Sequence, residues 1–142
     1  MAKKHPSSKP RLDALCPCES GKPYSSCCEK FHLGTPAPTA ESLMRSRYSA
    51  YVFGLEPYLL ATWHPDTRPA ALNLDEDQAI QWLGLQIKQA KTTDTTATVN
   101  FVARYKVGGK AHRLCELSQF VRKQNVWYYV TGDHPDTNSV LS

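Results

Sequence analysis

The 142-residue chain contains no long uninterrupted apolar run, and its first ten residues, MAKKHPSSKP, are basic and polar. A membrane-spanning helix needs about 20 predominantly apolar residues in succession, so the sequence excludes such a span. A secretory signal peptide needs an apolar core of about 7–15 residues, and this N-terminal segment has none. We therefore expect a cytoplasmic protein, in a compartment where thiols stay reduced.

The sequence patterns of several common catalytic sites are also missing. There is no glycine-rich phosphate loop, no nucleophile elbow and no zinc-protease helix. The net charge of +4 is modest, and part of it lies in the first eleven residues, within a segment, 1–14, that we expect to be a disordered tail. A nucleic-acid-binding domain would show a denser basic patch with interleaved aromatic residues. These absences argue against an enzyme of a familiar class and against a nucleic-acid partner.

What the chain does hold is a cluster of four of its five cysteines. Cys16, Cys18, Cys27 and Cys28 follow the pattern C-x-C-x8-C-C. Four thiolates on a short loop form a tetrahedral shell around one soft divalent ion, most often zinc. We predict one zinc ion bound by these four residues. Because such a shell leaves no position for a reactive water, the predicted role of the zinc is structural.

Two other interpretations of the cluster remain open. The cysteines could form disulfides, although such frameworks are typical of secreted domains and adjacent cysteines rarely bridge each other. They could also be reduced thiols without a metal. The spacing differs from the common C-x2-C pairs, so His32, four residues after Cys28, is a candidate to replace one of the cysteine ligands.

The rest of the chain predicts helices followed by strands. Thr39 is a candidate N-cap for a helix with apolar residues at helical spacing that ends near Gly54. We expect two shorter helices over 56–63 and 75–82. Strands with alternating or β-rich sequence are predicted over 83–91, 95–107, 110–123 and 126–130, with turns at 108–109 and 124–125. This order predicts an α+β domain with its helices packed on one side of a curved antiparallel sheet.

The stretch from Cys16 to Cys28 resembles the SEC-C motif, a short zinc-binding element found at the C-terminus of the SecA translocation motor and in other bacterial proteins. The resemblance implies that the four cysteines hold one zinc and that the element, over 15–33, is a candidate binding surface for a protein partner. Two features depart from the motif. Glu19 stands where the family usually has glycine, and residues 22–26 lack the lysine-rich character of the family's loop.

A second resemblance covers roughly residues 15–132. The segments LMRSRY, TWHP, WLGL, VNFVARY and WYY occur in that order, beginning at Leu43, Thr62, Trp82, Val99 and Trp127. Together they resemble the bacterial YchJ family. The resemblance implies a nuclear-transport-factor-like (cystatin-like) cone domain over 39–133, after the zinc element and before a C-terminal tail over 134–142. It implies a fold and no particular activity.

Cone folds of this kind often enclose a pocket on the concave face of the sheet. If Phe120 faces inward, Glu116 and Ser118 do so too, because strand residues two apart share a face. A carboxylate in such a pocket needs a hydrogen-bond donor or a cation, or else its pKa rises. The candidate partners and walls of this pocket are Arg45, Arg47, Tyr48, Trp63, His64 and Trp127.

Two functional hypotheses follow. In the first, the chain is a non-catalytic zinc-binding protein whose zinc element presents a rigid surface to a protein partner. In the second, the cone binds a small molecule and performs weak acid–base chemistry with Glu116 and His64. An ion pair between Glu116 and an arginine that only fixes a helix against the sheet is the competing explanation for the same residues.

Overall fold

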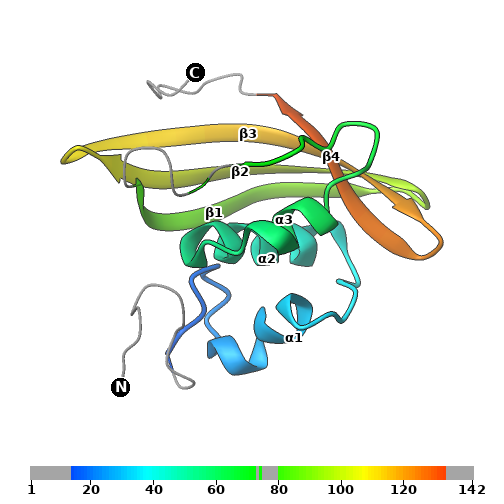
Figure 1. Ribbon diagram of the computed structural model, residues 1–142, viewed down its shortest axis with the longest axis horizontal. Coiled ribbons are helices and arrows are strands. Elements are labelled where there is room, and N and C mark those ends of the chain that lie inside the picture. The colour runs from blue at the N-terminus through cyan, green and yellow to red at the C-terminus, as the bar shows by residue number, and fades with distance from the viewer. Residues whose placement is uncertain (1–13, 73, 75–79, 134–142) are drawn as a thin grey trace.

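The computed structural model of the chain describes residues 14–72, 74 and 80–133. Figure 1 shows a curved antiparallel sheet, the helices α2 (Ala40–Phe53) and α3 (Glu56–Ala61) below it, and a cysteine-rich segment on the far side of the helices. We call residues 15–33 the cysteine element. It includes the one-turn 3-10 helix η2 (Tyr24–Ser26) and the short helix α1 (Glu29–His32). The predicted α+β class, with helices before a curved antiparallel sheet, is confirmed.

Helix α2 begins and ends where the sequence predicts. The Thr39 hydroxyl oxygen accepts a hydrogen bond from the backbone N–H of Ser42 (3.0 Å), and the Ser42 hydroxyl bonds back to Thr39. This reciprocal capping box fixes the first turn. Gly54 ends the helix in the left-handed region (φ 73°), where glycine has no steric penalty. The result is one continuous helix of 14 residues at the centre of the molecule.

Helix α3 ends earlier than predicted, at Ala61 instead of Trp63. The chain leaves the helix there because its backbone pairs with the strand β4 (Val126–Asp133). The His64 N–H donates to the Tyr129 carbonyl (2.8 Å), and the Tyr129 N–H donates to the Thr62 carbonyl (2.9 Å). Pairing with the sheet therefore ends the helix before Pro65, a residue that could not continue it.

The helix predicted over 75–82 is wrong at Ile80–Trp82, which begin the strand β1 (Ile80–Thr92). Residues 75–79 lie outside the described part of the chain. Trp82 pairs with Tyr105 of the strand β2 (Thr96–Val107). The cross-strand pairing of Trp82 with Tyr105 outweighs the local helical pattern of the segment that ends at Trp82.

The sheet has the order β1-β2-β3-β4, and all neighbours are antiparallel, as in a meander. Strand β3 (Lys110–Lys123) follows β2 through Gly108 and Gly109, whose φ angles are 59° and 79°. The turn from β3 to β4 uses Gln124 and Asn125 at φ 53° and 68°. Both predicted hairpin turns are confirmed, since two left-handed residues match the twist of the flanking strands.

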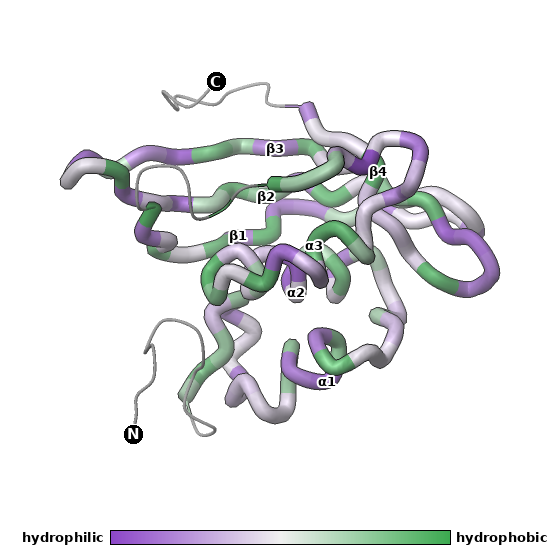
Figure 2. The backbone as a smooth tube through the Cα atoms, viewed as in Figure 1, coloured by the Kyte–Doolittle hydropathy of each residue, from purple (hydrophilic) through white to green (hydrophobic). Residues whose placement is uncertain are grey.

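The predicted alternation along β2 is confirmed. Its inward residues are all buried and pack under α2: Ala97, Val99, Phe101, Ala103 and Tyr105. Figure 2 shows hydrophobic and hydrophilic residues alternating along the neighbouring strands. The core of the domain therefore lies between this face of the sheet and α2, with Leu43, Met44 and Tyr48 supplied by the helix.

Strand β1 departs from the predicted alternation because it contains a bulge at Leu83. Trp82 pairs with Tyr105 and Gly84 pairs with Arg104, which leaves Leu83 without a partner on β2. Leu83 is 41% exposed, whereas Leu85 is buried. The sequence predicts these two leucines on one face, and the bulge makes that prediction wrong.

None of the described helices is long and apolar enough to cross a membrane. The tails predicted over 1–14 and 134–142 lie outside the described residues, apart from Ala14.

Candidate metal centre

The first part of the cysteine element is a tight loop that turns Cys16 and Cys18 toward α1. Leu15 forms an antiparallel bridge with Pro23. The Cys16 N–H donates to the Lys22 carbonyl (2.9 Å), which closes the loop between them. The second cysteine pair follows directly, and Cys28 is the N-cap residue of α1. Local backbone pairing thus brings together two cysteine pairs that are nine residues or more apart in sequence.

All four predicted cysteines meet in this cluster. Their sulfur atoms lie within 4.8 Å of one another. The Sγ atoms of Cys18 and Cys27 are 3.6 Å apart, and those of Cys27 and Cys28 are 4.0 Å apart. Sulfurs bound to one tetrahedral ion at about 2.3 Å would be about 3.8 Å apart. These separations fit a shared metal ion.

The disulfide interpretation is wrong. No disulfide joins any of the five cysteines, all of which lie in the described part of the chain, and the distances within the cluster far exceed a disulfide bond of about 2.05 Å.

Burial and donor chemistry make the cluster compatible with a bound metal ion. Cys16, Cys18 and Cys28 are buried, and Cys27 is partly exposed. Without a metal, hydrogen bonds from the neighbouring thiols lower the pKa of Cys16, and the same bonds raise the pKa of Cys18 to about 11 and also raise that of Cys28. These hydrogen bonds therefore favour the thiolate form at Cys16 over that at Cys18 and Cys28. A bound divalent ion stabilises all four as thiolates and releases the remaining protons.

Helix α2 presents a stripe of residues at i, i+4 spacing to the cysteine element: Arg45, Ser49 and Phe53. The Ser49 hydroxyl oxygen lies 3.4 Å from the sulfur atoms of both Cys16 and Cys28. Hydrogen bonds of this kind to metal-bound sulfurs orient the ligands. The candidate metal centre is therefore built partly by the helix of the following domain, a contribution the sequence did not reveal.

Arg45 belongs to this stripe and not to the predicted pocket. Its guanidinium donates from Nη1 to the Cys18 carbonyl (2.6 Å) and from Nε to the carboxylate of Glu41 (3.2 Å). The sequence-based hypothesis places Arg45 beside Glu116. The structure places it on the opposite side of α2, against the cysteine loop.

His32 does not replace a cysteine ligand. Its Nε2–H donates to the Ser46 carbonyl (2.9 Å), and its Nδ1 accepts from the Tyr24 hydroxyl (2.7 Å). Both ring nitrogens are therefore engaged, and burial lowers the pKa of the imidazole below its ordinary value. His32 joins α1 to α2 as a neutral side chain.

Glu116 and Ser118 do lie together on the inner face of β3, beside Tyr129 of β4. The Glu116 carboxylate accepts hydrogen bonds from the Ser118 hydroxyl and from the Tyr129 hydroxyl (3.2 Å for the latter). Phe120 packs against the ring of Tyr129 at 5.8 Å between centroids. The sequence missed Tyr129. The feature that could have identified Tyr129 is its pairing with Phe120 when β3 and β4 form their hairpin.

Arg47 lies near this group but binds other partners. It is 3% exposed, and its Nη1 donates to the Leu59 carbonyl (2.8 Å) and to the Thr62 hydroxyl (2.7 Å). Its guanidinium carbon lies 4.5 Å from the ring centroid of Tyr129 and 5.1 Å from that of Trp63. Burial lowers the pKa of this guanidinium. Arg47 therefore ties α2 to α3 and β4.

The other predicted pocket residues lie apart from Glu116. The Nδ1 of His64 accepts a hydrogen bond from the Asp66 N–H (3.0 Å). Trp127 is buried and its ring lies under Arg122, with 5.6 Å from the guanidinium carbon to the centroid. Tyr48 packs against Trp82 at 5.7 Å between ring centroids. The predicted set thus divides among several places in the fold.

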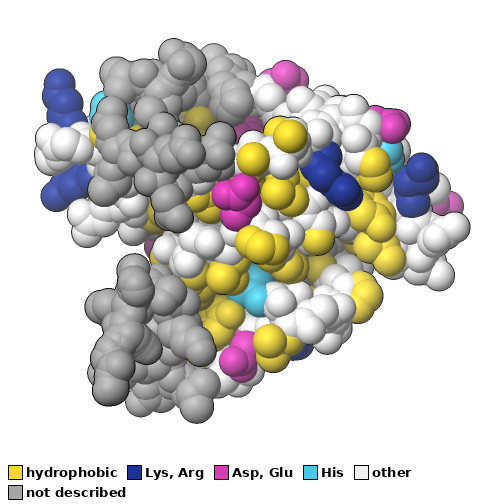
Figure 3. All heavy atoms as spheres, in the orientation of Figure 1, with side chains coloured by type: hydrophobic (Ala, Val, Ile, Leu, Met, Phe, Trp, Pro, Cys, Tyr) yellow, Lys and Arg dark blue, Asp and Glu magenta, His cyan; other side chains and the backbone are white. Residues whose placement is uncertain are grey.

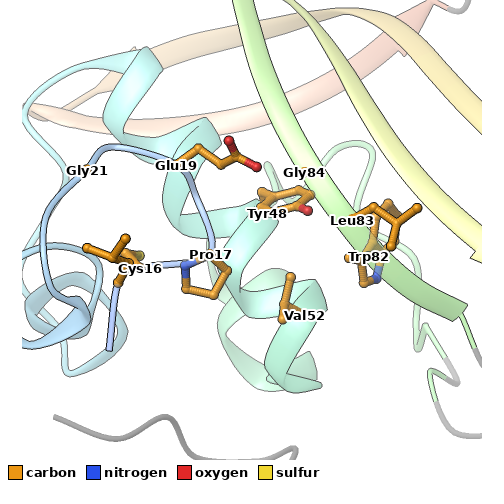
Figure 4. A pocket seen from close by; sticks show the side chains of 10 residues that line it. Cys16, Pro17, Glu19, Gly21, Tyr48, Val52, Trp82, Leu83 and Gly84 are labelled. Atoms are coloured by element: carbon orange, nitrogen blue, oxygen red, sulfur yellow. The ribbon is translucent and has the colours of Figure 1, made fainter. Parts of the chain in front are cut away.

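The structure contains a cleft that the sequence did not predict, between the cysteine element and β1. Figure 4 shows Cys16 and Pro17 on one side, β1 residues on the other, and α2 behind them. The cleft has a volume of about 420 Å³. Its lining comes from three separate segments: Leu15, Cys16, Pro17, Glu19, Gly21, Tyr48, Val52, Trp82, Leu83 and Gly84. Of the residues singled out from the sequence, Cys16 and Tyr48 lie here and Glu116 does not.

Glu19 reaches across this cleft from a left-handed backbone conformation (φ 66°). That conformation explains why glycine is usual at this place in the SEC-C motif. The carboxylate of Glu19 and the guanidinium of Arg104 both lie over Gly84, where a Cβ atom would collide with them. The side chain that departs from the motif therefore contacts the edge strand of the sheet.

Comparison with known proteins gives a consistent result. Residues 39–132 match the family model described as the YchJ middle NTF2-like domain. The chain is 54% identical over 132 residues to a UPF0225 protein of Chromobacterium violaceum, covering 88% of this chain and 96% of that one. It is 53% identical over 135 residues to a UPF0225 protein of Bordetella bronchiseptica, covering 92% and 98%.

Two solved structures share the fold. The solution structure of a SEC-C motif containing protein from Rhodopseudomonas palustris matches with a TM-score of 0.76 and 31% identity, covering 85% of this chain and 98% of that one. The crystal structure of a SEC-C motif containing protein from Psychrobacter arcticus matches with a TM-score of 0.69 and 27% identity, covering 89% and 84%. Both matches extend over most of the chain, so they include more than the sheet.

Proposed function

The chain belongs to the YchJ-like family of UPF0225 proteins, and from that premise we propose that it is a non-catalytic zinc-binding protein that acts as a protein-interaction module. One observation carries the proposal: four cysteine sulfurs lie within 4.8 Å of one another in a largely buried cluster. The solved relatives named for their SEC-C motif support a metal at the same element.

Zinc is the metal that best suits this donor set. Four thiolates are soft ligands, and their tetrahedral arrangement favours Zn²⁺ over harder ions such as Mg²⁺ or Ca²⁺. With four protein ligands the ion has no free position for a substrate or a reactive water. The role that follows is structural: the zinc orders the cysteine element and holds it against α2. The cysteines, all within the described residues, are thiols and not disulfides, which supports a cytoplasmic location, where thiols remain reduced.

An acid–base function at Glu116 has less support. The carboxylate is buried and already accepts hydrogen bonds from Ser118 and Tyr129. His64, its candidate acid–base partner, accepts a hydrogen bond from Asp66 instead. The cleft lies elsewhere, between the cysteine element and β1. We therefore assign Glu116 an architectural role, in which it fixes β3 against β4.

Native mass spectrometry of the purified chain tests the zinc proposal. We expect one zinc ion per wild-type chain and none in a Cys16→Ser/Cys18→Ser variant, because two thiolates are insufficient for a tetrahedral site. Cys115→Ser is the matched control, since Cys115 lies in β3 outside the cluster, and this variant should keep its zinc.

A second measurement on the same samples addresses folding. Circular dichroism should show that the double variant retains its sheet, so that loss of zinc is not merely a consequence of global unfolding. Wild-type chain that is free of metal yet keeps an ordered cysteine element would contradict the proposal.

A further inference from the structure

The two edges of the sheet differ in how they are covered. The edge of β4 is paired with the segment after α3 through backbone hydrogen bonds of Thr62 and His64 with Tyr129, and the Thr67 hydroxyl donates to the Val130 carbonyl (2.7 Å). On the outer side of β1, no strand among the described residues is paired. Unpaired backbone groups on an edge strand can bond to an extended polypeptide segment. The cleft lies beside this open edge.

The cleft presents apolar side chains on both walls. Leu83, turned outward by the bulge, is 41% exposed, and Leu15 on the facing wall is 68% exposed. Val52 and Trp82 line the cleft between them. Figure 3 shows hydrophobic side chains reaching the surface between the sheet and the cysteine element. An occupant with apolar side chains would remove this surface from water.

The charge of the lining favours a cation. Among the lining residues, the formal charges are those of Glu19 and, in the zinc-bound form proposed above, of the Cys16 thiolate; one Zn²⁺ with four thiolates has a net charge of −2. The partly exposed ring of Trp82, which packs edge to face against the buried Tyr48 at 5.7 Å between centroids, adds an aromatic surface that attracts cations. The Arg104 guanidinium lies near the Glu19 carboxylate over Gly84, so an incoming cation would compete with it for that carboxylate.

From these observations we propose that the cleft between the cysteine element and β1 binds an extended segment of a partner protein in which apolar and basic residues alternate. Apolar side chains of the segment insert between Leu15 and Leu83, and a lysine or arginine lies against Glu19. The inference rests on the proposed function, because the zinc-ordered loop is one wall of the cleft.

NMR titration of the full-length, ¹⁵N-labelled, zinc-loaded chain tests the inference. The probe is the peptide acetyl-Leu-Lys-Leu-Lys-amide, and acetyl-Leu-Glu-Leu-Glu-amide is its control. We expect the lysine peptide to bind with a dissociation constant of about 1 mM or tighter, and at least about ten-fold more tightly than the glutamate peptide. Changes in chemical shift should be confined to residues that line the cleft, and the Trp82 indole N–H and the Gly84 amide report on them.

Three variants sharpen this test. Glu19→Gln should weaken binding of the lysine peptide about three-fold, as expected for an ion pair with an exposed carboxylate. Leu83→Ser should weaken it about five-fold or more by removing apolar contact. Leu33→Ser is the matched control, because Leu33 is an exposed leucine (79%) outside the cleft lining, and it should not alter binding.

Each remaining outcome is decisive. Equal affinity for the two peptides, shifts away from the cleft, or insensitivity to Leu83→Ser would overturn the inference. If the lysine peptide binds only after residues 1–13 are deleted, the chain's own N-terminus is the occupant and a partner segment is not. Zinc content is measured in every sample. A zinc-loaded chain that does not bind the lysine peptide contradicts this inference alone. A purified chain that contains no zinc contradicts the proposed function.

Discussion

Gly132 in β4 is a position where the absence of a side chain makes room for a buried carboxyl group. A Cβ atom built there would overlap the carboxyl group of Glu116. The φ angle of Gly132 is not positive, so the requirement is for space and not for a left-handed backbone. The hydrogen bonds of Glu116 to Ser118 and Tyr129 depend on this space.

We expect Gly132→Ala to lower the free energy of unfolding by about 1–3 kcal/mol, because the new methyl group overpacks a buried site. In a Glu116→Ala background the same substitution should cost little, since the colliding group is gone. Urea denaturation of the four zinc-saturated proteins measures both effects as a double-mutant cycle. Additive effects of the two substitutions would show that Gly132 and Glu116 do not share this space.

At this scale the sequence identified the cysteines better than the polar residues around them. Cysteine spacing predicts a shared site because the loop between the pairs is too short to separate them widely. Arg45 and Arg47, by contrast, are two residues apart on one helix and point to nearly opposite sides. The sequence does not say which of them faces the sheet, because α2 is covered on both sides.

Among the elements, α2 is the one with two buried sides. Ser46, Arg47, Tyr48, Ser49 and Ala50 are buried in succession, and five consecutive residues cover the whole circumference of a helix. One side meets the sheet and the other meets the cysteine element. Polar residues therefore occupy buried positions, which makes the apolar pattern of α2 less distinct than that of β2.

The short helix α1 depends on α2 through His32, and this contact should be sensitive to pH. Burial lowers the folded-state pKa of His32 below its unfolded value of about 6.5. A group with a depressed folded-state pKa contributes stability that is present above the unfolded pKa and is lost as the pH falls through the folded pKa. Protonation would also place a proton on Nδ1, which accepts from Tyr24.

We therefore expect the stability difference between wild type and His32→Gln to shrink as the pH falls below about 6.5. Glutamine can still donate to the Ser46 carbonyl but does not titrate. Denaturation of both proteins at matched pH, with zinc in excess, measures the difference, and acid loss of zinc largely cancels between them. A stability difference that is constant from pH 8 to pH 5 would contradict the assignment of a neutral His32.

For the whole molecule, the buried hydrophobic residues form two clusters. The larger one joins α2 to the sheet and also includes Phe31 of α1, whereas the smaller one contains three cysteines, Tyr24 and the partly buried Cys27 and Phe53. The larger cluster contains no cysteine. The cone domain should therefore keep its core without the metal.

Chelation of the metal should consequently disorder the cysteine element while the sheet persists. We expect NMR signals from residues 15–33 to lose dispersion when a strong zinc chelator is added, because the buried thiols lose the cation that holds them together. Amides of β2 and β3 should remain protected from hydrogen exchange. Global unfolding on chelation would show that the cone needs the zinc, and an unchanged spectrum would show that the element does not.

The order of elements and the class of fold could be predicted from the sequence, whereas the cleft could not. Periodicity and turn residues act over a few neighbouring residues, so they predict α2, the hairpins and the alternation of β2. The cleft joins segments around residues 15–21, 48–52 and 82–84, and no local pattern gives the distance between them. Its shape also depends on the bulge at Leu83, which an alternating sequence conceals.

That bulge is a phase shift in the two-residue repeat of the strand. Trp82 and Leu85 pair with Tyr105 and Ala103, which share the inner face of β2, although the first two are three residues apart. Without the extra residue, the start of β1 would turn over, and Trp82 would leave its contacts with Tyr48 and Tyr105. One inserted residue thus decides which face of the sheet the first side chains of β1 lie on. It thereby also decides whether β1 forms a wall of the cleft.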